Sequence, residues 1–198
     1  MAVQDAAEVR IVLTHGHGDH SGAVAALARS VGCKVFGPEL PGLVDTPLGD
    51  GDAVSTDDGE LIAVHTPGHT EEHLSFHWPE RRALFAGDLL LGEGDTTWVA
   101  EYPGCVADYL RSLERLRSLD LAVIYPAHGP PLEDPPAALD RFESHRRSRI
   151  EQVVEALADR PDATLDDLLL VVYGDLLPAT MRGAAAKSLS ALLDYVRG

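Results

Sequence analysis

Four side chains that could bind metal ions lie close together near the start of the chain. Directly after the apolar stretch Val9 to Leu13, a run of six residues contains His15, His17, Asp19 and His20. If this run forms a tight loop at the end of a strand, His15 and His17 project the same way and can hold one ion. Asp19 and His20 then turn toward a second ion. The alternative is a polar surface loop rich in histidine, which we disfavour because further ligand-type residues follow downstream.

Three more ligand-type side chains come directly after short apolar runs that we predict to be strands. They are His69 in a Thr-Pro-Gly-His-Thr segment, Asp88 and His128. Proline and glycine before His69 favour a sharp turn that aims the imidazole back over the edge of the sheet. A carboxylate after a buried strand, such as Asp88, is either a helix cap or a ligand. Three strands that each end in a ligand-type residue favour the ligand interpretation.

The order and type of these motifs resemble the metallo-β-lactamase superfamily of binuclear hydrolases. The motifs are His-x-His-x-Asp-His, Thr-Pro-Gly-His-Thr, Gly-Asp and Pro-x-His-Gly. The resemblance implies an α/β (α+β) fold, the αββα sandwich, with its metals at one sheet edge. It implies one ion on His15, His17 and His69, and a second on Asp19, His20 and His128.

The same resemblance implies a catalytic role for two carboxylates. Asp88 would bridge both ions, and Asp19 would also orient a hydroxide that bridges them. Imidazole and carboxylate ligands without a thiolate suit two Zn²⁺ ions, with iron or manganese as possible occupants. We therefore expect a metal-dependent hydrolase that needs no serine or cysteine nucleophile.

The closest resemblance covers nearly the whole chain and is to the family of lactamase-beta-like protein 2. It rests on the segments 85–98, 108–116 and 125–130 and on a later His-Arg-Arg-Ser-Arg run. That family implies a C-terminal helical, winged-helix-like domain and an endoribonuclease-like activity on phosphodiesters of single-stranded RNA. The residues that we expect to contact such a substrate are His73, His145, Arg146 and Arg147.

Two other functions stay open. The aspartate at position 88 is similar to that of the glyoxalase II thioesterases, so hydrolysis of a small-molecule thioester or acyl compound is one alternative. The aspartate at position 88 also argues against cleavage of lactam antibiotics. The other alternative is a non-catalytic metal-binding remnant, because only fourteen residues precede His15 where the family has several strands. We accordingly expect an N-terminally truncated first sheet with an unpaired edge, and a chain that stops short of the family's C-terminal β wing.

Charge and composition bear on the substrate. The chain of 198 residues has 32 acidic and 16 basic residues and a formal net charge of −16, which disfavours a nonspecific grip on nucleic acid. A local basic patch on the helix that carries Arg141, Arg146 and Arg147 could compensate. The alternative is a solvated helix face whose arginines pair with glutamates such as Glu143.

Composition also sets expectations for compartment and redox state. A hydrophobic content of 45% is typical of a globular domain. No apolar stretch approaches the roughly twenty residues of a membrane span, and no signal-like segment is evident, so we expect a cytoplasmic protein without membrane contact. Cys33 and Cys105 follow no ligand spacing and are expected to be free thiols.

The remaining pattern predicts the elements that position these residues. We expect a metal-binding domain over 1–134, in which strands and loops alternate, and a helical domain over 135–198. In the first domain we expect helices over 23–31 and 108–119, a strand over 34–36, and paired strands over 53–64 and 74–85. In the second we expect helices over 137–158, 165–173 and about 178–196, with Thr164 and Asp167 forming a capping box.

Overall fold

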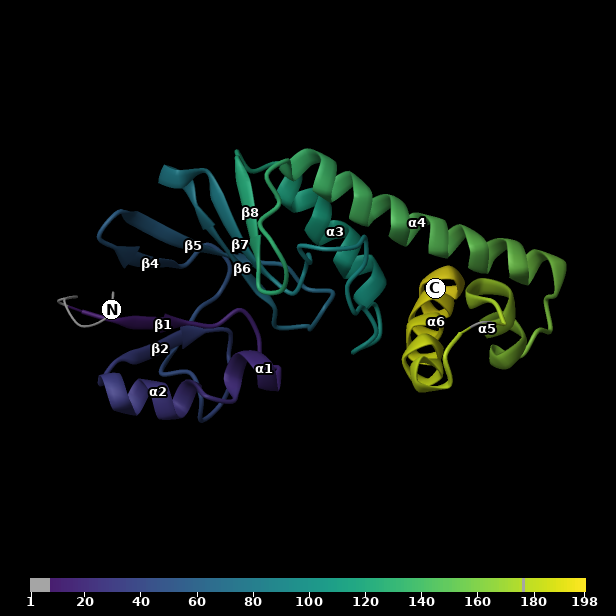
Figure 1. Ribbon diagram of the computed structural model, residues 1–198, viewed down its shortest axis with the longest axis horizontal. Helices are drawn as coiled ribbons and strands as arrows, with labels where there is room; N and C mark the ends of the chain where they lie inside the picture. The colour runs from purple at the N-terminus through teal and green to yellow at the C-terminus, as the bar shows by residue number, and fades with distance from the viewer. Residues whose placement is uncertain (1–7, 176) are drawn as a thin grey trace.

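The computed structural model describes residues 8–175 and 177–198. Two sheets face each other and each carries helices on its outer side, so the layers run helix, sheet, sheet, helix (Figure 1). The first sheet contains the parallel strands β1 (Arg10–Val12), β2 (Lys34–Gly37) and β3 (Thr46–Pro47), in that order. The expected αββα fold is confirmed.

The second sheet has five strands in the order in which they occur in the chain. They are β4 (Ala53–Thr56), β5 (Gly59–His65), β6 (Leu74–Trp78), β7 (Ala83–Gly87) and β8 (Val123–Pro126). The neighbours from β4 to β7 are antiparallel; β4–β5 and β6–β7 have short connections, the latter through a 3-10 helix, η1 (Pro79–Arg81), whereas residues 66–73 join β5 to β6. β8 is parallel to β7, because the long connection through α3 (Cys105–Arg117) carries the chain back to the start of the sheet.

Two helices follow the loop after β1. α1 (Gly18–Ser21) is a single turn, and α2 (Val24–Val31) packs on the first sheet. Val24 of α2 forms a small core cluster with Leu13 and Val35. α2 ends at Gly32, whose left-handed backbone (φ 73°) is one that glycine adopts without strain. This cluster anchors both sides of the loop that contains the histidines.

The C-terminal residues form three helices: α4 (Pro135–Asp159), α5 (Leu165–Tyr173) and α6 (Arg182–Arg197). α5 and α6 lie together beneath the far half of α4, away from the first sheet (Figure 1). The main core is continuous from Ile124 on β8 through Phe142 on α4 to Leu189 on α6. The helices therefore pack on the second sheet through one shared core, and a domain boundary at 134/135 stays a prediction.

Most predicted elements are present, with shifted ends. α3 begins at Cys105 instead of Asp108, directly after Gly104. α6 begins at Arg182 instead of near Pro178, because Pro178 is extended (ψ 138°) and a short 3-10 helix, η2 (Ala179–Met181), intervenes. The capping box before α5 is confirmed. The N-terminal truncation and the β wing stay predictions.

Three smaller observations complete the fold. Within the described residues, β1 pairs with β2 alone, so its other edge carries no strand. Cys33 and Cys105 are free thiols, as expected. In the described part of the chain, none of the helices combines the length and the apolar character that crossing a bilayer requires. The cytoplasmic location stays a prediction.

Candidate metal centre

The structure brings the seven predicted metal ligands together in two groups. The ligand atoms within each group all lie within 4.8 Å of one another; one group is His15, His17 and His69, and the other is Asp19, His20, Asp88 and His128. Asp88 faces both groups. Its Oδ2 lies 3.4 Å from Nε2 of His20 and 3.6 Å from Nε2 of His69, and its Oδ1 lies 3.5 Å from Nε2 of His128.

Strand direction explains this convergence. β5, β7 and β8 run the same way, because β6 lies antiparallel between β5 and β7 and because β8 is parallel to β7. The carboxyl ends of these three strands therefore share one edge of the second sheet, and each is followed by a ligand. The remaining ligands come from α1 and from the end of β1. The backbone N–H of Leu74 donates to the Thr14 carbonyl oxygen at 2.8 Å, which ties the two sheets together at this edge.

The donor set fits divalent metal ions. Three buried atoms of the cluster have no hydrogen-bond partner among the described residues: Nε2 of His15, Nε2 of His20 and Oδ1 of Asp88. A buried polar atom without a partner costs about 1–3 kcal/mol, and such atoms are rare in native proteins. Nδ1 of His69 donates to the Trp98 carbonyl oxygen at 2.9 Å, which leaves the Nε2 lone pair free for a metal.

Burial keeps two of the candidate ligand histidines, His15 and His69, neutral. Desolvation and the neighbouring imidazoles of His20, His69 and His17 lower the pKa of His15 to about 3. Burial also lowers the pKa of His69. Neutral imidazole is the form that binds a metal, so these two rings need not lose a proton at pH 7 to become ligands.

Several residues hold the ligands from behind, and most of them had no predicted role. The Thr97 hydroxyl donates to the Asp88 carbonyl oxygen at 2.6 Å. The backbone N–H of Gly16 donates to Oε1 of Glu72 at 3.2 Å. Thr97 and Trp98 lie in the irregular segment between β7 and α3, which carries no periodic pattern. Their proximity to Asp88 and His69 is therefore visible only in the tertiary structure.

His73 lies behind the metal ligands. Its ring is completely buried. Nε2 accepts a hydrogen bond from the backbone N–H of Asp88 at 3.3 Å, and Nδ1 lies 3.0 Å from the Thr66 hydroxyl. The ring has no exposed surface and positions Asp88; the predicted contact of His73 with substrate stays a prediction.

The predicted substrate residues on α4 lie in different surroundings, and their contact with substrate stays a prediction. Arg146 is 3% exposed, and its guanidinium donates to the Thr97 carbonyl oxygen at 3.1 Å. Arg147 lies on the surface but is paired with Glu143 at 2.7 Å. His145 is partly buried beside Asp95, with Nε2 3.8 Å from a carboxylate oxygen. The alternative of a solvated, ion-paired helix face describes Arg147, whereas Arg146 belongs to the interior.

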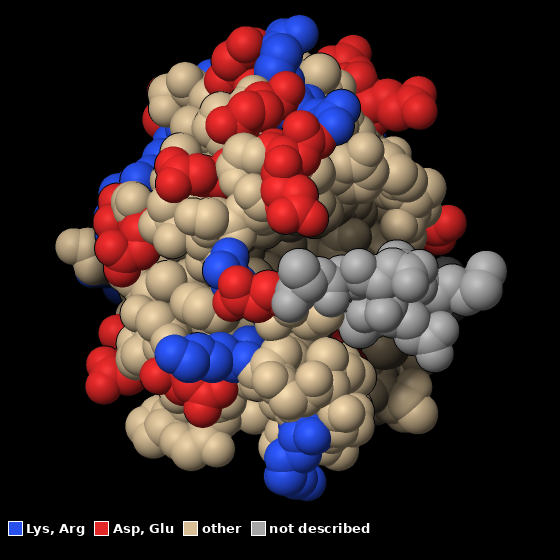
Figure 2. Space-filling model, turned by 90° about the vertical axis from the view of Figure 1, so that its left-hand side faces the viewer, with Lys and Arg blue, Asp and Glu red and all other residues tan. Residues whose placement is uncertain are grey.

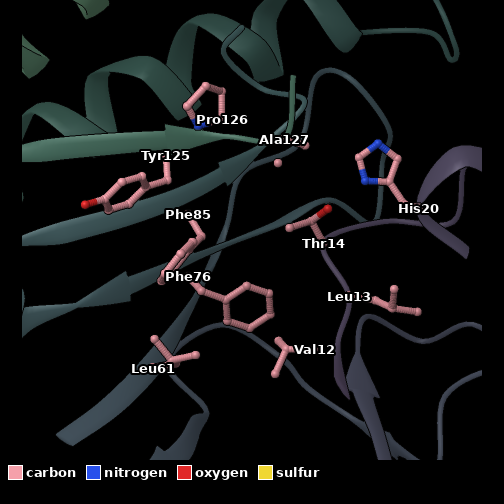
Figure 3. A pocket seen from close by; sticks show the side chains of 11 residues that line it. Val12, Leu13, Thr14, His20, Leu61, Phe76, Phe85, Tyr125, Pro126 and Ala127 are labelled. Atoms are coloured by element: carbon pink, nitrogen blue, oxygen red, sulfur yellow. The ribbon is translucent and has the colours of Figure 1, made fainter. Parts of the chain in front are cut away.

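An apolar cavity of about 520 Å³ opens between the two sheets. Val12 and Leu13 line it from the first sheet, and Phe76 and Phe85 line it from the second; His20 lies at one end (Figure 3). The cavity lies along β1, whose second edge carries no strand within the described residues. An additional strand paired with β1 would cover these side chains. This surface has room for the N-terminal strands that the family resemblance implies, and those strands stay a prediction.

Comparison with known proteins identifies the class. The family model described as the metallo-beta-lactamase superfamily matches residues 8–42 and 36–128. The beta-lactamase-like protein 2 homolog of Caenorhabditis elegans is 33% identical over 191 residues, which cover 92% of this chain and 63% of that protein. The chain thus spans less than two thirds of this relative. It belongs to the metallo-β-lactamase superfamily, whose fold and ligand cluster define a class of metal-dependent hydrolases.

Other relatives bear on chemistry and metal. A protein of Aspergillus fumigatus named atrochrysone carboxyl ACP thioesterase is 35% identical over 150 residues, 74% of this chain and 34% of that protein. The metallo-beta-lactamase family protein TTHA1429 from Thermus thermophilus superposes with a TM-score of 0.76 at 25% identity, covering 95% of this chain and 74% of its own. TTHA1623, crystallised in a di-iron-bound form, has a TM-score of 0.51 at 28% identity over 69% of this chain and 75% of its own.

Proposed function

We propose that this protein is a binuclear zinc hydrolase that cleaves thioesters or related acyl compounds. His15, His17 and His69 would hold one ion, and Asp19, His20 and His128 would hold the other, with Asp88 between them. Two divalent ions in this cluster would supply an activated water and would polarise the scissile carbonyl. Zinc suits the nitrogen and oxygen donors; iron is the alternative, because TTHA1623 binds two irons.

The observation that favours an acyl substrate over RNA is that three arginines of α3 and α4 are either buried or paired with carboxylates. Arg146 is buried, Arg147 is paired with Glu143, and Arg117 bridges Glu143 and Asp140. The face in Figure 2 shows groups of acidic side chains with only scattered basic ones between them. Binding a polyanion requires free lysine and arginine side chains to neutralise phosphates. The net charge of −16 works in the same direction. The thioesterase name of the Aspergillus fumigatus relative supports the acyl alternative.

The residues around the ions would divide the work between positioning and proton transfer. The Trp98 carbonyl fixes the tautomer and orientation of His69, and Thr97 and His73 hold the backbone of Asp88. Asp19 is more exposed, with 57% of its side chain accessible, and its Oδ2 lies 3.1 Å from Nε2 of His128. If Oδ2 of Asp19 is the ligand atom, Oδ1 would accept the proton of an attacking water.

The test compares acyl and phosphodiester substrates on one zinc-loaded sample. We expect hydrolysis of at least one member of a panel of acyl-thiol substrates and no cleavage of single-stranded RNA. Asp88→Asn should lower kcat/KM by about 100-fold or more, because it disturbs both ions, whereas Arg147→Gln should leave thioester hydrolysis unchanged. RNA cleavage that depends on Asp88, with no thioester turnover, would overturn the proposal. Two bound zinc ions with no turnover of either substrate class would instead indicate a metal-binding remnant.

A further inference from the structure

A second cavity, of about 390 Å³, lies where the C-terminal helices meet the segment after β7. Its size falls within the range of small-molecule sites, roughly 300–1,000 Å³. One wall comes from Thr97 and Trp98, another from residues of α4, and the rest from the end of α5 and from α6. The cavity is thus formed only when the helices pack against the metal-binding half of the chain.

The wall formed by α4 is cationic, and its two arginines have no carboxylate partner within the described residues. Arg146 and Arg149 line the cavity, and neither forms a salt bridge within the described residues, whereas the neighbouring Arg147 does. The Nε of Arg146 is buried without a hydrogen-bond partner, as is Nδ1 of His145. Burying a guanidinium without an anion is costly. This corner of the cavity is therefore suited to a negatively charged group.

Aromatic rings hold the two guanidinium groups in place. The Cζ of Arg146 lies 5.3 Å from the ring centroid of Tyr109, and the Cζ of Arg149 lies 5.0 Å from that of Tyr173. Such cation–π contacts orient an arginine without neutralising its charge. The guanidinium of Arg149 also donates to the Val172 carbonyl oxygen at 2.8 Å. Both cations are thus pre-organised, which lowers the entropy cost of binding an anion.

The other side chains around the cavity are mainly apolar. They include Leu91, Trp98, Tyr173, Leu177 and Met181. A ligand that fills the cavity would therefore combine an apolar body with one acidic group. Inorganic phosphate would leave the apolar wall uncovered, and a neutral hydrocarbon would leave the two arginines without a partner.

The cavity shares a wall with the metal centre. Thr97 and Trp98 line it, and the same residues bond to Asp88 and to His69 through the Thr97 hydroxyl and the Trp98 carbonyl. We propose that this cavity binds an organic anion, a carboxylate on an aromatic or branched aliphatic body. If the proposed acyl hydrolysis is correct, this anion is a free carboxylate carried by the acyl part of the substrate, separate from the scissile thioester; otherwise it belongs to a separate effector.

The proposal is tested by titrating the zinc-loaded protein with 2-naphthoate in a calorimeter and, in parallel, with the neutral 2-naphthamide. We expect the carboxylate to bind about tenfold more tightly or better, since a charge-assisted hydrogen bond is stronger than a neutral one. Arg149→Gln and Arg146→Gln should each remove most of this preference. Ser188→Phe, which places a ring in the cavity and keeps both arginines, should abolish binding of both compounds. Arg147→Gln, on the outer face of α4, is the matched control and should bind as the parent protein does.

Each outcome has a definite meaning. Equal affinity for the carboxylate and the amide would overturn the proposal. Binding of naphthoate that survives both Arg149→Gln and Ser188→Phe would also overturn it, because the carboxylate would then sit on the zinc ions. Competitive inhibition of thioester hydrolysis by naphthoate would assign the cavity to the acyl part of the substrate. Cavity binding in a protein that hydrolyses no thioester would leave the organic-anion site standing and would remove the proposed function.

Discussion

At the scale of single residues, the site depends on histidines that burial keeps neutral. His15 and His73 are both fully shielded from solvent, and burial is the first cause that lowers the pKa of each. In a buried neutral imidazole, one ring nitrogen accepts a hydrogen bond or binds a metal, and the other donates a hydrogen bond. His15 would use this capacity for a metal ion, and His73 uses it to hold the backbone of Asp88.

These depressed pKa values predict how stability depends on pH. In the unfolded chain the histidines take up protons below about pH 6.5, whereas folded His15 does so only near pH 3. The unfolded state then binds more protons as pH falls from about 6.5 toward 3, so the metal-free protein should lose stability across that interval. Urea unfolding of chelator-treated protein at several pH values between neutral and mildly acidic measures the slope.

Two variants test whether His15 causes the dependence of stability on pH. His15→Gln should flatten the dependence in mildly acidic solution, because its side chain cannot take up a proton in the unfolded state. His65→Gln, at an exposed position on β5, should leave the slope unchanged. A slope that is the same in the parent protein and in His15→Gln would show that the charge state of His15 does not govern stability here.

At the scale of elements, close packing between a turn and a helix positions His69. Gly68 has a φ of 139°, and a Cβ placed on it would come within 2.7 Å of the Cα of Tyr109 in α3. The side chain of Ser112 in α3 donates to the Pro67 carbonyl oxygen at 2.7 Å. The turn after β5 therefore rests directly on α3, and only glycine permits this approach.

The packing predicts opposite effects at two glycines. Gly68→Ala should destabilise the protein by about 2 kcal/mol or more and reduce zinc content, since the methyl group would push α3 away from His69. Gly183→Ala should stabilise it by up to about 1 kcal/mol, because Gly183 lies in α6 and no atom lies within 4 Å of the place that the added methyl group would take. Urea unfolding and elemental analysis check both. A neutral Gly68→Ala would contradict the close contact with Tyr109.

For the molecule as a whole, metal binding and net charge both act on the equilibrium between the folded and unfolded states. The formal net charge of −16 makes the folded chain repel itself, and the metal centre draws ligands from both sheets. An ion that binds only the folded state stabilises it in proportion to the logarithm of its concentration over Kd. A bound metal would therefore fasten the first sheet to the second at the edge where the candidate ligands meet.

Removal of metal should accordingly loosen the whole molecule. We expect chelation to lower Tm by several degrees and two equivalents of Zn²⁺ to restore it, with about 3 kcal/mol gained at a hundredfold excess over Kd. Differential scanning calorimetry with Asp88→Asn as the control separates the site from nonspecific binding. An equal response to zinc in that variant would place the stabilising ions elsewhere. In the absence of metal, about 0.5 M salt should raise Tm by screening the acidic surface.

The sequence by itself determined the class of fold and which candidate metal ligands come together, because both depend on local patterns. Ligand spacing in the run after Leu13 and ligand-type residues after apolar strands are enough to predict a shared edge, since strands of the same direction end together. The capping box at Thr164 is equally local, and it was predicted to the residue. The first residues of α3 and α6, Cys105 and Arg182, were not predicted correctly, because the turns that precede these helices set where they begin.

Only the tertiary structure decided what the cations and the irregular segment do. Arg146 and Arg147 are adjacent and chemically identical, yet one is buried under Thr97 and the other is paired with Glu143 on the surface. A helix turns by about 100° per residue, so neighbours face different surroundings, and the identity of those surroundings depends on how distant segments pack. For the same reason His73 proved to be a support for Asp88, and the cavity beside Trp98 exists only where α4 and α6 meet the metal-binding half.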